Sequence, residues 1–150
     1  MISIDKFKIV VENTPLISID FIIKNSEGNY LLGKRVNEPA CGYWFTLGGR
    51  IFKNETIKDA VKRLSKKEFN QERSLDSLKF HGNYEHFYDN SFADENISTH
   101  YIVLAYELNL KQDLDLPKDE HDEYNYFSKE EILNSSYVHT YVKNYFKEGN

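Results

Sequence analysis

One amphipathic helix of the chain carries an acidic residue where a core residue is expected. At about 100° per residue, four apolar side chains of this helix fall within a stripe roughly 100° wide: Ile57, Ala60, Val61 and Leu64. Glu68 lies on the same stripe, near the middle of the core-facing side. Burying an unpaired carboxylate costs several kcal/mol or forces it to take up a proton. Glu68 therefore requires an explanation.

Three explanations are open for Glu68. The end of the helix could fray and release the side chain to solvent, a buried arginine could pair with it, or it could bind a cation. The residues before the helix favour the cation. Gly48 and Gly49 predict a tight turn with free carbonyl oxygens, which are hard ligands suited to Mg²⁺. Arg50 and Arg63 add forked donors suited to phosphate, so the group predicts chemistry on a diphosphate.

Other ionisable residues interrupt apolar strands or charged loops. Asp20 stands inside "SIDFII", and a buried strand aspartate needs a partner. His121 lies in "KDEHDEY", which on charge alone is typical of a solvated acidic loop. A lone histidine in a strand, such as His86, is typical of a structural residue. A tyrosine in a strand, such as Tyr101, is typical of core packing.

The predicted elements place these residues on a mixed sheet. We expect a helix over 3–12 with Ser3 as N-cap, and the cap pattern of Thr56 and Asp59 begins the central helix. Ser128 and Glu131 form a capping box for a helix through Leu133. A final amphipathic segment covers 137–147. The strands are expected at 15–24, 30–35, 42–49, 77–89, 98–110 and 123–128, with the first two forming a hairpin. Strands before and after a central helix, without βαβ alternation, predict an α/β (α+β) fold.

Composition bounds the remaining possibilities. The 150 residues predict a single domain over 1–150, and a net charge of -5 gives no footprint for nucleic acid. No apolar run is long enough to cross a membrane, and the N-terminus lacks the pattern of a signal peptide. Cys41 is the single cysteine, so a cytoplasmic location is expected.

The spacing of Gly49, Glu55, Arg63 and Glu68 resembles the Nudix box. The match is partial, because Leu64 and Lys67 stand where the box has glutamates and Asn70 where it has its second glycine. Five further segments resemble the GDP-mannose mannosyl hydrolases, a Nudix family with the same degeneracy. They are "TPLISIDFIIKN", "LLGKRVNEPACGYWFTLGGR", "EHFYDNSF", "STHYIVLAYEL" and "LPKDEHDEYNYFS". The resemblance covers about residues 8 to 146.

This resemblance implies a Nudix fold, in which a mixed β-sheet is sandwiched between α-helices. It implies hydrolysis of GDP-mannose, or of GDP-glucose, to GDP and free sugar. Water would attack the anomeric carbon with inversion, through an oxocarbenium-like transition state. One Mg²⁺ per subunit is implied, with Mn²⁺ as a substitute, and the family forms homodimers.

The resemblance also implies roles for individual residues. The metal ligands would be Gly48, Gly49, Glu68 and Glu120, the last replacing the glutamine of familiar relatives. His121 would be the general base. Departure of the leaving group would be assisted by Arg35, Arg50, Arg63 and Tyr101. Asp20 would lie near the sugar and the base, and His86 would also contact the substrate.

Two other functions remain open on the sequence. An ordinary Nudix pyrophosphohydrolase would cleave a nucleotide sugar at phosphorus, which the reduced set of box carboxylates disfavours. A non-catalytic module would only bind the nucleotide sugar. Retention of Arg50, Arg63, Glu68 and His121 together favours an enzyme.

Overall fold

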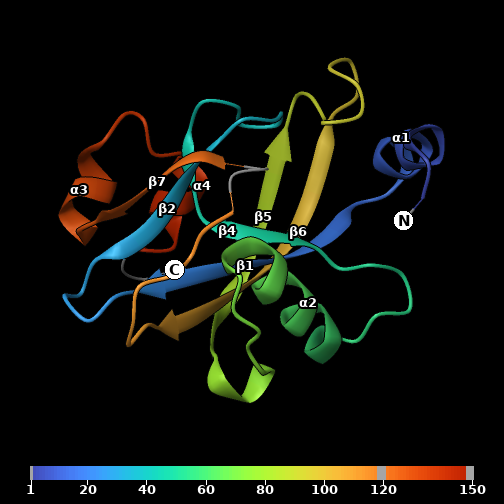
Figure 1. Ribbon diagram of the computed structural model, residues 1–150. Helices are drawn as coiled ribbons and strands as arrows, with labels where there is room; N and C mark the ends of the chain where they lie inside the picture. Colours follow the sequence, from blue (N-terminus) through green and yellow to red (C-terminus); the bar gives the residue numbers. More distant parts are fainter. Residues whose placement is uncertain (1, 118–120, 148–150) are drawn as a thin grey trace.

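The computed structural model describes residues 2–117 and 121–147, and for residues 121 and 122 only the backbone. Within these residues the fold is a seven-stranded mixed sheet with helices packed on it (Figure 1). The elements are α1 (Ile4–Asn13), β1 (Leu16–Lys24), β2 (Tyr30–Arg35), β3 (Trp44–Phe45), β4 (Leu47–Arg50), α2 (Ile57–Phe69), η1 (Leu75–Ser77), β5 (Lys79–Tyr88), β6 (Thr99–Asn109), β7 (His121–Phe127), α3 (Lys129–Asn134) and α4 (Thr140–Asn144).

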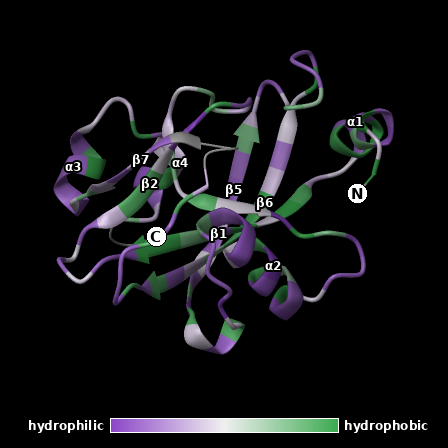
Figure 2. Ribbon diagram, in the orientation of Figure 1, coloured by the Kyte–Doolittle hydropathy of each residue, from purple (hydrophilic) through white to green (hydrophobic). Residues whose placement is uncertain are grey.

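Strand β1 is the centre of the sheet. It pairs in parallel with β6 from Leu16↔Tyr101 to Lys24↔Asn109. On its other side it pairs antiparallel with β4 and, at Lys24↔Tyr30, with β2. A strand with neighbours on both edges and elements on both faces is largely buried, and β1 is buried except at Ile17 and Lys24 and hydrophobic along most of its length (Figure 2).

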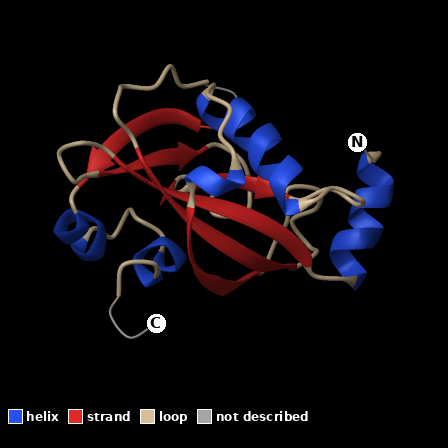
Figure 3. Cartoon of the chain, turned by 90° about the horizontal axis from the view of Figure 1, so that it is seen from below, coloured by secondary structure: helices blue, strands red, loops and turns tan. Residues whose placement is uncertain are grey.

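The two faces of β1 support two separate cores. Ile19, Phe21 and Ile23 point to the face covered by α2. Because side chains alternate along a strand, Ile22 points to the opposite face, where it packs with residues of α3 and α4. Figure 3 shows α2 on one side of the sheet and the two C-terminal helices on the other. The predicted arrangement of a mixed sheet between helices is confirmed.

Helix α2 follows the predicted pattern. The Thr56 side chain accepts the Asp59 N–H at 3.0 Å, and Ala60, Val61, Leu64 and Glu68 are all buried. Asn70 ends the helix in the left-handed conformation, with φ of 56°. Ile57 is the exception, since it is the first residue of the helix and stays 39% exposed.

Three sequence predictions need correction. Gly48 and Gly49 do not form a turn, because they are residues of β4 that pair with Asp20 and Ile19 of β1. Strand β7 begins at His121 rather than at residue 123, because the acidic segment continues the pairing with β2. The last helix is shorter than 137–147, because the His139 side chain caps it by accepting the Tyr141 N–H.

None of the helices in the part of the chain that the structure describes has the length and hydrophobicity of a membrane span.

Candidate active site

A cleft opens where β4 passes between the end of α2 and the strands β1, β5 and β6. Its cavity volume is about 80 Å³. The residues around it are Ser18, Asp20, Arg35, Pro39, Phe45, Thr46, Gly48, Gly49, Arg50, Glu68, His86, Tyr88 and Tyr101. Among the predicted site residues whose side chains the structure describes, all except Arg63 therefore line one cleft.

Glu68 reaches this cleft from the last turn of α2. Its side chain is buried, and one carboxylate oxygen accepts the Gly48 N–H at 3.0 Å. The backbone of β4 is thus one partner of the buried carboxylate. Its hard oxygens at the wall of a polar cleft match the ligands that Mg²⁺ prefers. Within the described residues, no three His, Cys, Asp or Glu side chains are grouped as a metal site.

The two glycines let β4 approach its neighbours closely. A Cβ on Gly48 would lie 2.1 Å from the Ile19 carbonyl oxygen, and a Cβ on Gly49 would lie 2.5 Å from Leu64 Cδ2. The absence of a Cβ at these two positions therefore serves packing against β1 and α2. It also brings the Gly48 backbone to Glu68.

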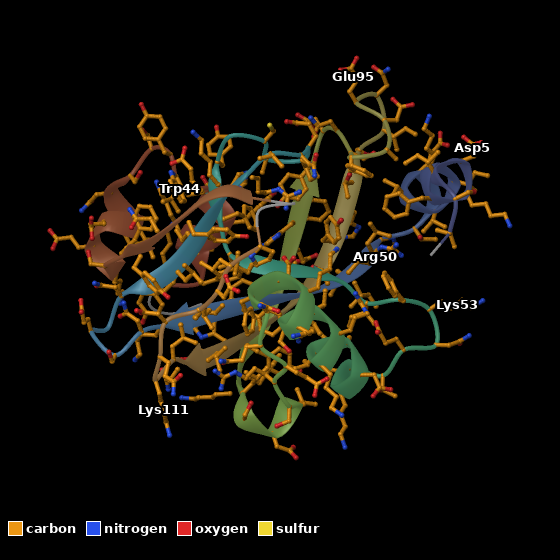
Figure 4. The ribbon with its side chains drawn as sticks, in the orientation of Figure 1. Asp5, Trp44, Arg50, Lys53, Glu95 and Lys111 are labelled. Atoms are coloured by element: carbon orange, nitrogen blue, oxygen red, sulfur yellow. The ribbon has the colours of Figure 1, made fainter. Side chains whose placement is uncertain are left out.

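The basic side of the cleft consists of Arg35 and Arg50 with Tyr101. Arg35 Nε donates to the Pro39 carbonyl at 2.8 Å, which fixes the guanidinium. The Arg50 guanidinium lies over the rings of Phe7 and Phe52, at 4.7 and 5.2 Å, between β4 and α1 (Figure 4). Partial burial is the main cause that lowers the pKa of Arg50. Two oriented guanidinium groups suit a diphosphate.

Arg63 does not line the cleft. Its guanidinium donates to both oxygens of Glu55, at 2.7 and 2.9 Å, and to the Arg50 carbonyl at 2.8 Å. This bidentate pair leaves Arg63 in contact with the backbone next to Arg50 rather than with the cleft. The predicted direct role of Arg63 at the leaving group does not match this geometry, and we interpret Arg63 as a residue that positions β4.

The predicted general base is placed only through its backbone. His121 begins β7 and pairs with Arg35 of β2, next to a register shift between Lys34 and Arg35. Arg35 lines the cleft, so the start of β7 lies beside it. Glu120, the fourth predicted metal ligand, lies outside the described residues.

A polar chamber forms the inner end of the cleft around Asp20. Asp20 Oδ2 accepts the Thr46 hydroxyl at 2.9 Å and the Tyr145 hydroxyl in a short hydrogen bond. Burial raises the pKa of Asp20 to about 6, although these hydrogen bonds and Arg35 oppose the shift. The strand aspartate therefore has the partners that burial requires.

His86 lies behind Asp20 in the same chamber. Its ring stacks on Tyr141 with centroids 4.3 Å apart, and only 3% of the residue is exposed. Burial, with a further contribution from His139, lowers the pKa of His86 to about 3. His86 is therefore a neutral imidazole at physiological pH.

Sequence reasoning missed the partners of Asp20. Thr46 lies two residues before Gly48 in "FTLGG", and a hydroxyl in that stretch was an available signal. Tyr145 lies 125 residues from Asp20, and among eleven tyrosines no sequence signal distinguished it. His139, which had no predicted role, contributes to the electrostatics of His86.

The cleft continues outward into a hydrophobic groove. This groove shares Arg35, Arg50 and Tyr101 with the polar chamber and adds the aromatic residues Phe7, Phe52 and Phe92. The cleft and the groove are thus joined through Arg35, Arg50 and Tyr101.

Comparison with known proteins agrees with this architecture. Residues 14–146 match the family model of the NUDIX domain. A relative in Haloferax volcanii, "Low-salt glycan biosynthesis protein Agl8", is 43% identical over 109 residues, which are 73% of this chain and 68% of that protein.

Solved structures show the same fold. A MutT protein from Methanosarcina mazei Go1 superimposes with a TM-score of 0.71 at 23% identity, over 89% of this chain and 92% of that one. The NUDIX domain of Shewanella oneidensis NrtR, solved with ADP ribose, gives a TM-score of 0.65 at 13% identity, over 89% and 85% of the two chains. At these identities the likeness concerns the fold.

Proposed function

Since the chain belongs to the NUDIX domain family, we propose that this hydrolase fold cleaves GDP-mannose, or GDP-glucose, to GDP and free sugar. Water attacks the anomeric carbon with inversion. The observation that carries the proposal is the composition of the cleft. Among the described residues that line it, Glu68 is the one carboxylate from α2, whereas Leu64 packs against Gly49. A site with so few carboxylates is poorly suited to the multiple cations of cleavage at phosphorus.

The three parts of the cleft and groove correspond to the three parts of a nucleotide sugar. The chamber of Asp20, His86 and Tyr88 suits a hexose, because its walls offer hydrogen-bonding groups. Arg35 and Arg50 suit the diphosphate. The aromatic groove suits the planar base by stacking. The name of the Haloferax relative supports a substrate from glycan biosynthesis.

The chain's own residues carry the steps of the proposed mechanism. Arg35 and Arg50 hold the diphosphate and favour its departure, since negative charge develops there. Tyr101 donates to a phosphate oxygen. His121, at the start of β7 beside Arg35, takes the proton from the attacking water. Asp20 holds the sugar so that its anomeric carbon faces this water.

NUDIX hydrolases generally use a divalent metal, and Glu68 with the backbone of Gly48 and Gly49 would hold Mg²⁺, or Mn²⁺ in its place. When bound, the ion supplies Lewis-acid stabilisation of the leaving diphosphate. Glu120 is proposed as the ligand from the segment before His121. We further propose that the enzyme is cytoplasmic, forms a homodimer and has no membrane or nucleic-acid partner.

Product analysis in ¹⁸O-labelled water tests the reaction. The protein is mixed with GDP-mannose and Mg²⁺, the products are separated, and their masses are determined by mass spectrometry. We expect GDP and labelled mannose. GMP with label in a phosphate group would identify cleavage at phosphorus and would overturn the role of His121. Tight binding of GDP-mannose without products would identify a binding module.

A further inference from the structure

A chain of hydrogen bonds joins the residues of the polar chamber to Tyr145. Tyr88 OH lies 3.4 Å from His86 Nδ1, and His86 Nε2 lies 3.3 Å from Tyr145 OH. The Tyr145 hydroxyl contacts Asp20 Oδ2, which also accepts from Thr46. Asp20, Thr46, His86 and Tyr145 are all buried, so the hydrogen bonds among these four side chains are shielded from water.

The direction of each hydrogen bond follows from Asp20. Its Oδ2 accepts two hydroxyl donors, so that oxygen carries no proton and Tyr145 must donate. The Tyr145 oxygen is then free to accept, and its neighbour in the chain is His86 Nε2. A neutral imidazole has one donor and one acceptor nitrogen, so Nε2 carries the hydrogen of His86. Nδ1 is left as the acceptor for the Tyr88 hydroxyl.

This order determines which groups the chamber presents to a ligand. Tyr88 uses its hydrogen on His86, so its oxygen is left as an acceptor. Asp20 uses Oδ2 on Tyr145 and Thr46, so Oδ1 is left as an acceptor. Oδ1 lies on the side of Gly48, 2.8 Å from where a Cβ on that glycine would be. Both Asp20 and Tyr88 line the cleft.

We propose that this chain of hydrogen bonds leaves only hydrogen-bond acceptors on the wall of the chamber that Asp20 and Tyr88 form. Asp20 and Tyr88 each accept a hydrogen bond from a sugar hydroxyl, and Tyr145 is the positioning residue. The inference rests on the proposed function for its ligand, a hexose attached to a nucleoside diphosphate. Tyr145 does not itself line the cleft. Tyr145 directly follows α4 and acts through its hydrogen bonds to Asp20 and His86.

The state of His86 tests the chain without any substrate. Nitrogen-15 NMR of the imidazoles, assigned with a His86→Gln variant, reports which ring nitrogen carries the hydrogen. We expect the Nε2–H tautomer in the wild type and a mixture in Tyr145→Phe, because Nε2 then loses its acceptor. An Nδ1–H tautomer in the wild type, or an unchanged tautomer in Tyr145→Phe, would overturn the proposal.

The affinity for the sugar tests the consequence. Calorimetry compares GDP-mannose with GDP for each variant in the presence of Mg²⁺, with His121→Asn added to every protein so that the substrate is not turned over. In Tyr145→Phe we expect GDP-mannose to bind about tenfold more weakly, as for the loss of a hydrogen bond to a charged group, while GDP binds as before. Single-deoxy analogues of GDP-mannose should identify two hydroxyls whose removal weakens wild-type binding, one of them with less effect in Tyr145→Phe.

Tyr84→Phe is the matched control. Its ring contacts that of Tyr145 with centroids 4.6 Å apart, but its hydroxyl takes no part in the chain of hydrogen bonds described above. The control should keep both the tautomer and the affinity. Full sugar affinity in Tyr145→Phe would overturn the inference and leave the proposed function intact. If the wild type bound GDP-mannose no better than GDP, the proposed substrate would be wrong instead. The His86 tautomer would still test the chain of hydrogen bonds.

Discussion

The Glu68 carboxylate accepts the Gly48 N–H at 3.0 Å, so the side chain proposed to bind the metal also ties helix α2 to strand β4. These two roles can be separated. In Glu68→Gln the amide oxygen can still accept from Gly48, but the negative charge is lost. We expect melting within a few degrees of the wild type and a loss of Mg²⁺-dependent turnover of at least about 100-fold.

Steady-state kinetics over a Mg²⁺ titration, together with thermal melts, measure this effect. Glu72→Gln is the control, because Glu72 is exposed shortly after the same helix and does not line the cleft. Full turnover in Glu68→Gln would exclude Glu68 as a ligand.

The pair of Glu55 and Arg63 is predicted to contribute to stability in a pH-dependent way. Hydrogen bonds from Arg63 are the main cause that lowers the pKa of Glu55. A carboxylate whose pKa is lower in the folded state stabilises that state above its unfolded pKa, near 4.5, and this contribution is lost as the pH falls through the folded pKa. Glu55→Gln should therefore cost about 1–3 kcal/mol at pH 7 and less below pH 4. Urea unfolding at the two pH values measures it, and an equal cost at both would contradict the prediction.

The two glycines of β4 should differ in their tolerance of a methyl group. A Cβ on Gly48 meets the backbone oxygen of Ile19, whereas a Cβ on Gly49 meets the end of the Leu64 side chain, which can move. We expect Gly48→Ala to cost about 3 kcal/mol or more and Gly49→Ala about 1–3 kcal/mol.

Leu64→Ala added to Gly49→Ala makes space for the methyl group, so the two changes together should cost less than the sum of the single costs. Denaturant unfolding measures all four variants. Equal costs for Gly48→Ala and Gly49→Ala would contradict the packing described for β4.

His86 should make the protein sensitive to mild acid. Burial lowers its pKa from 6.5 to about 3. A base whose pKa is lowered on folding binds protons more tightly in the unfolded chain, so stability is present above pH 6.5 and falls as the pH drops towards 3. At 1.36 kcal/mol per pH unit, the loss due to His86 between pH 7 and pH 5 is about 2 kcal/mol, which the raised pKa of Asp20 partly offsets. His86→Gln should show a smaller loss over this range, and the same slope in both proteins would contradict the buried neutral imidazole.

His121→Asn tests the general base. Since β7 begins at His121 beside Arg35, the change should leave the sheet intact and the affinity for GDP unaltered, while kcat falls by about 100-fold or more. His100→Asn is the control, because His100 stacks on Phe87 of β5 and does not line the cleft. A His121→Asn protein with full kcat would move the proton transfer to another residue.

Local patterns predicted most elements because the chemistry of caps and periodicity acts over a few residues. Ser3, Thr56 and Ser128 cap their helices as expected, and the burial of Glu68 followed from the helical period. The prediction of a turn at Gly48 and Gly49 was wrong. Gly-Gly is typical of turns, but here pairing with β1 holds both glycines in an extended strand.

The partners of the buried groups could not be read from the sequence in the same way. Asp20 signalled that it needed hydrogen bonds, but nothing near it in the sequence indicated Tyr145, which lies 125 residues away. Arg63 was associated with phosphate because arginine forks suit it. Only the folded chain shows that Arg63 donates from Nε and Nη2 to the two carboxylate oxygens of Glu55.

The bond between Asp20 and Tyr145 spans 125 residues of sequence. During translation Asp20 leaves the ribosome long before Tyr145 is made. Strands β1, β4 and β6 can pair in the nascent chain, since proteins begin to fold from the N-terminal side as they are synthesised. Until Tyr145 emerges, Asp20 lacks one of its two hydroxyl donors. A nascent protein that already has its central sheet is therefore still unable to complete its sugar chamber.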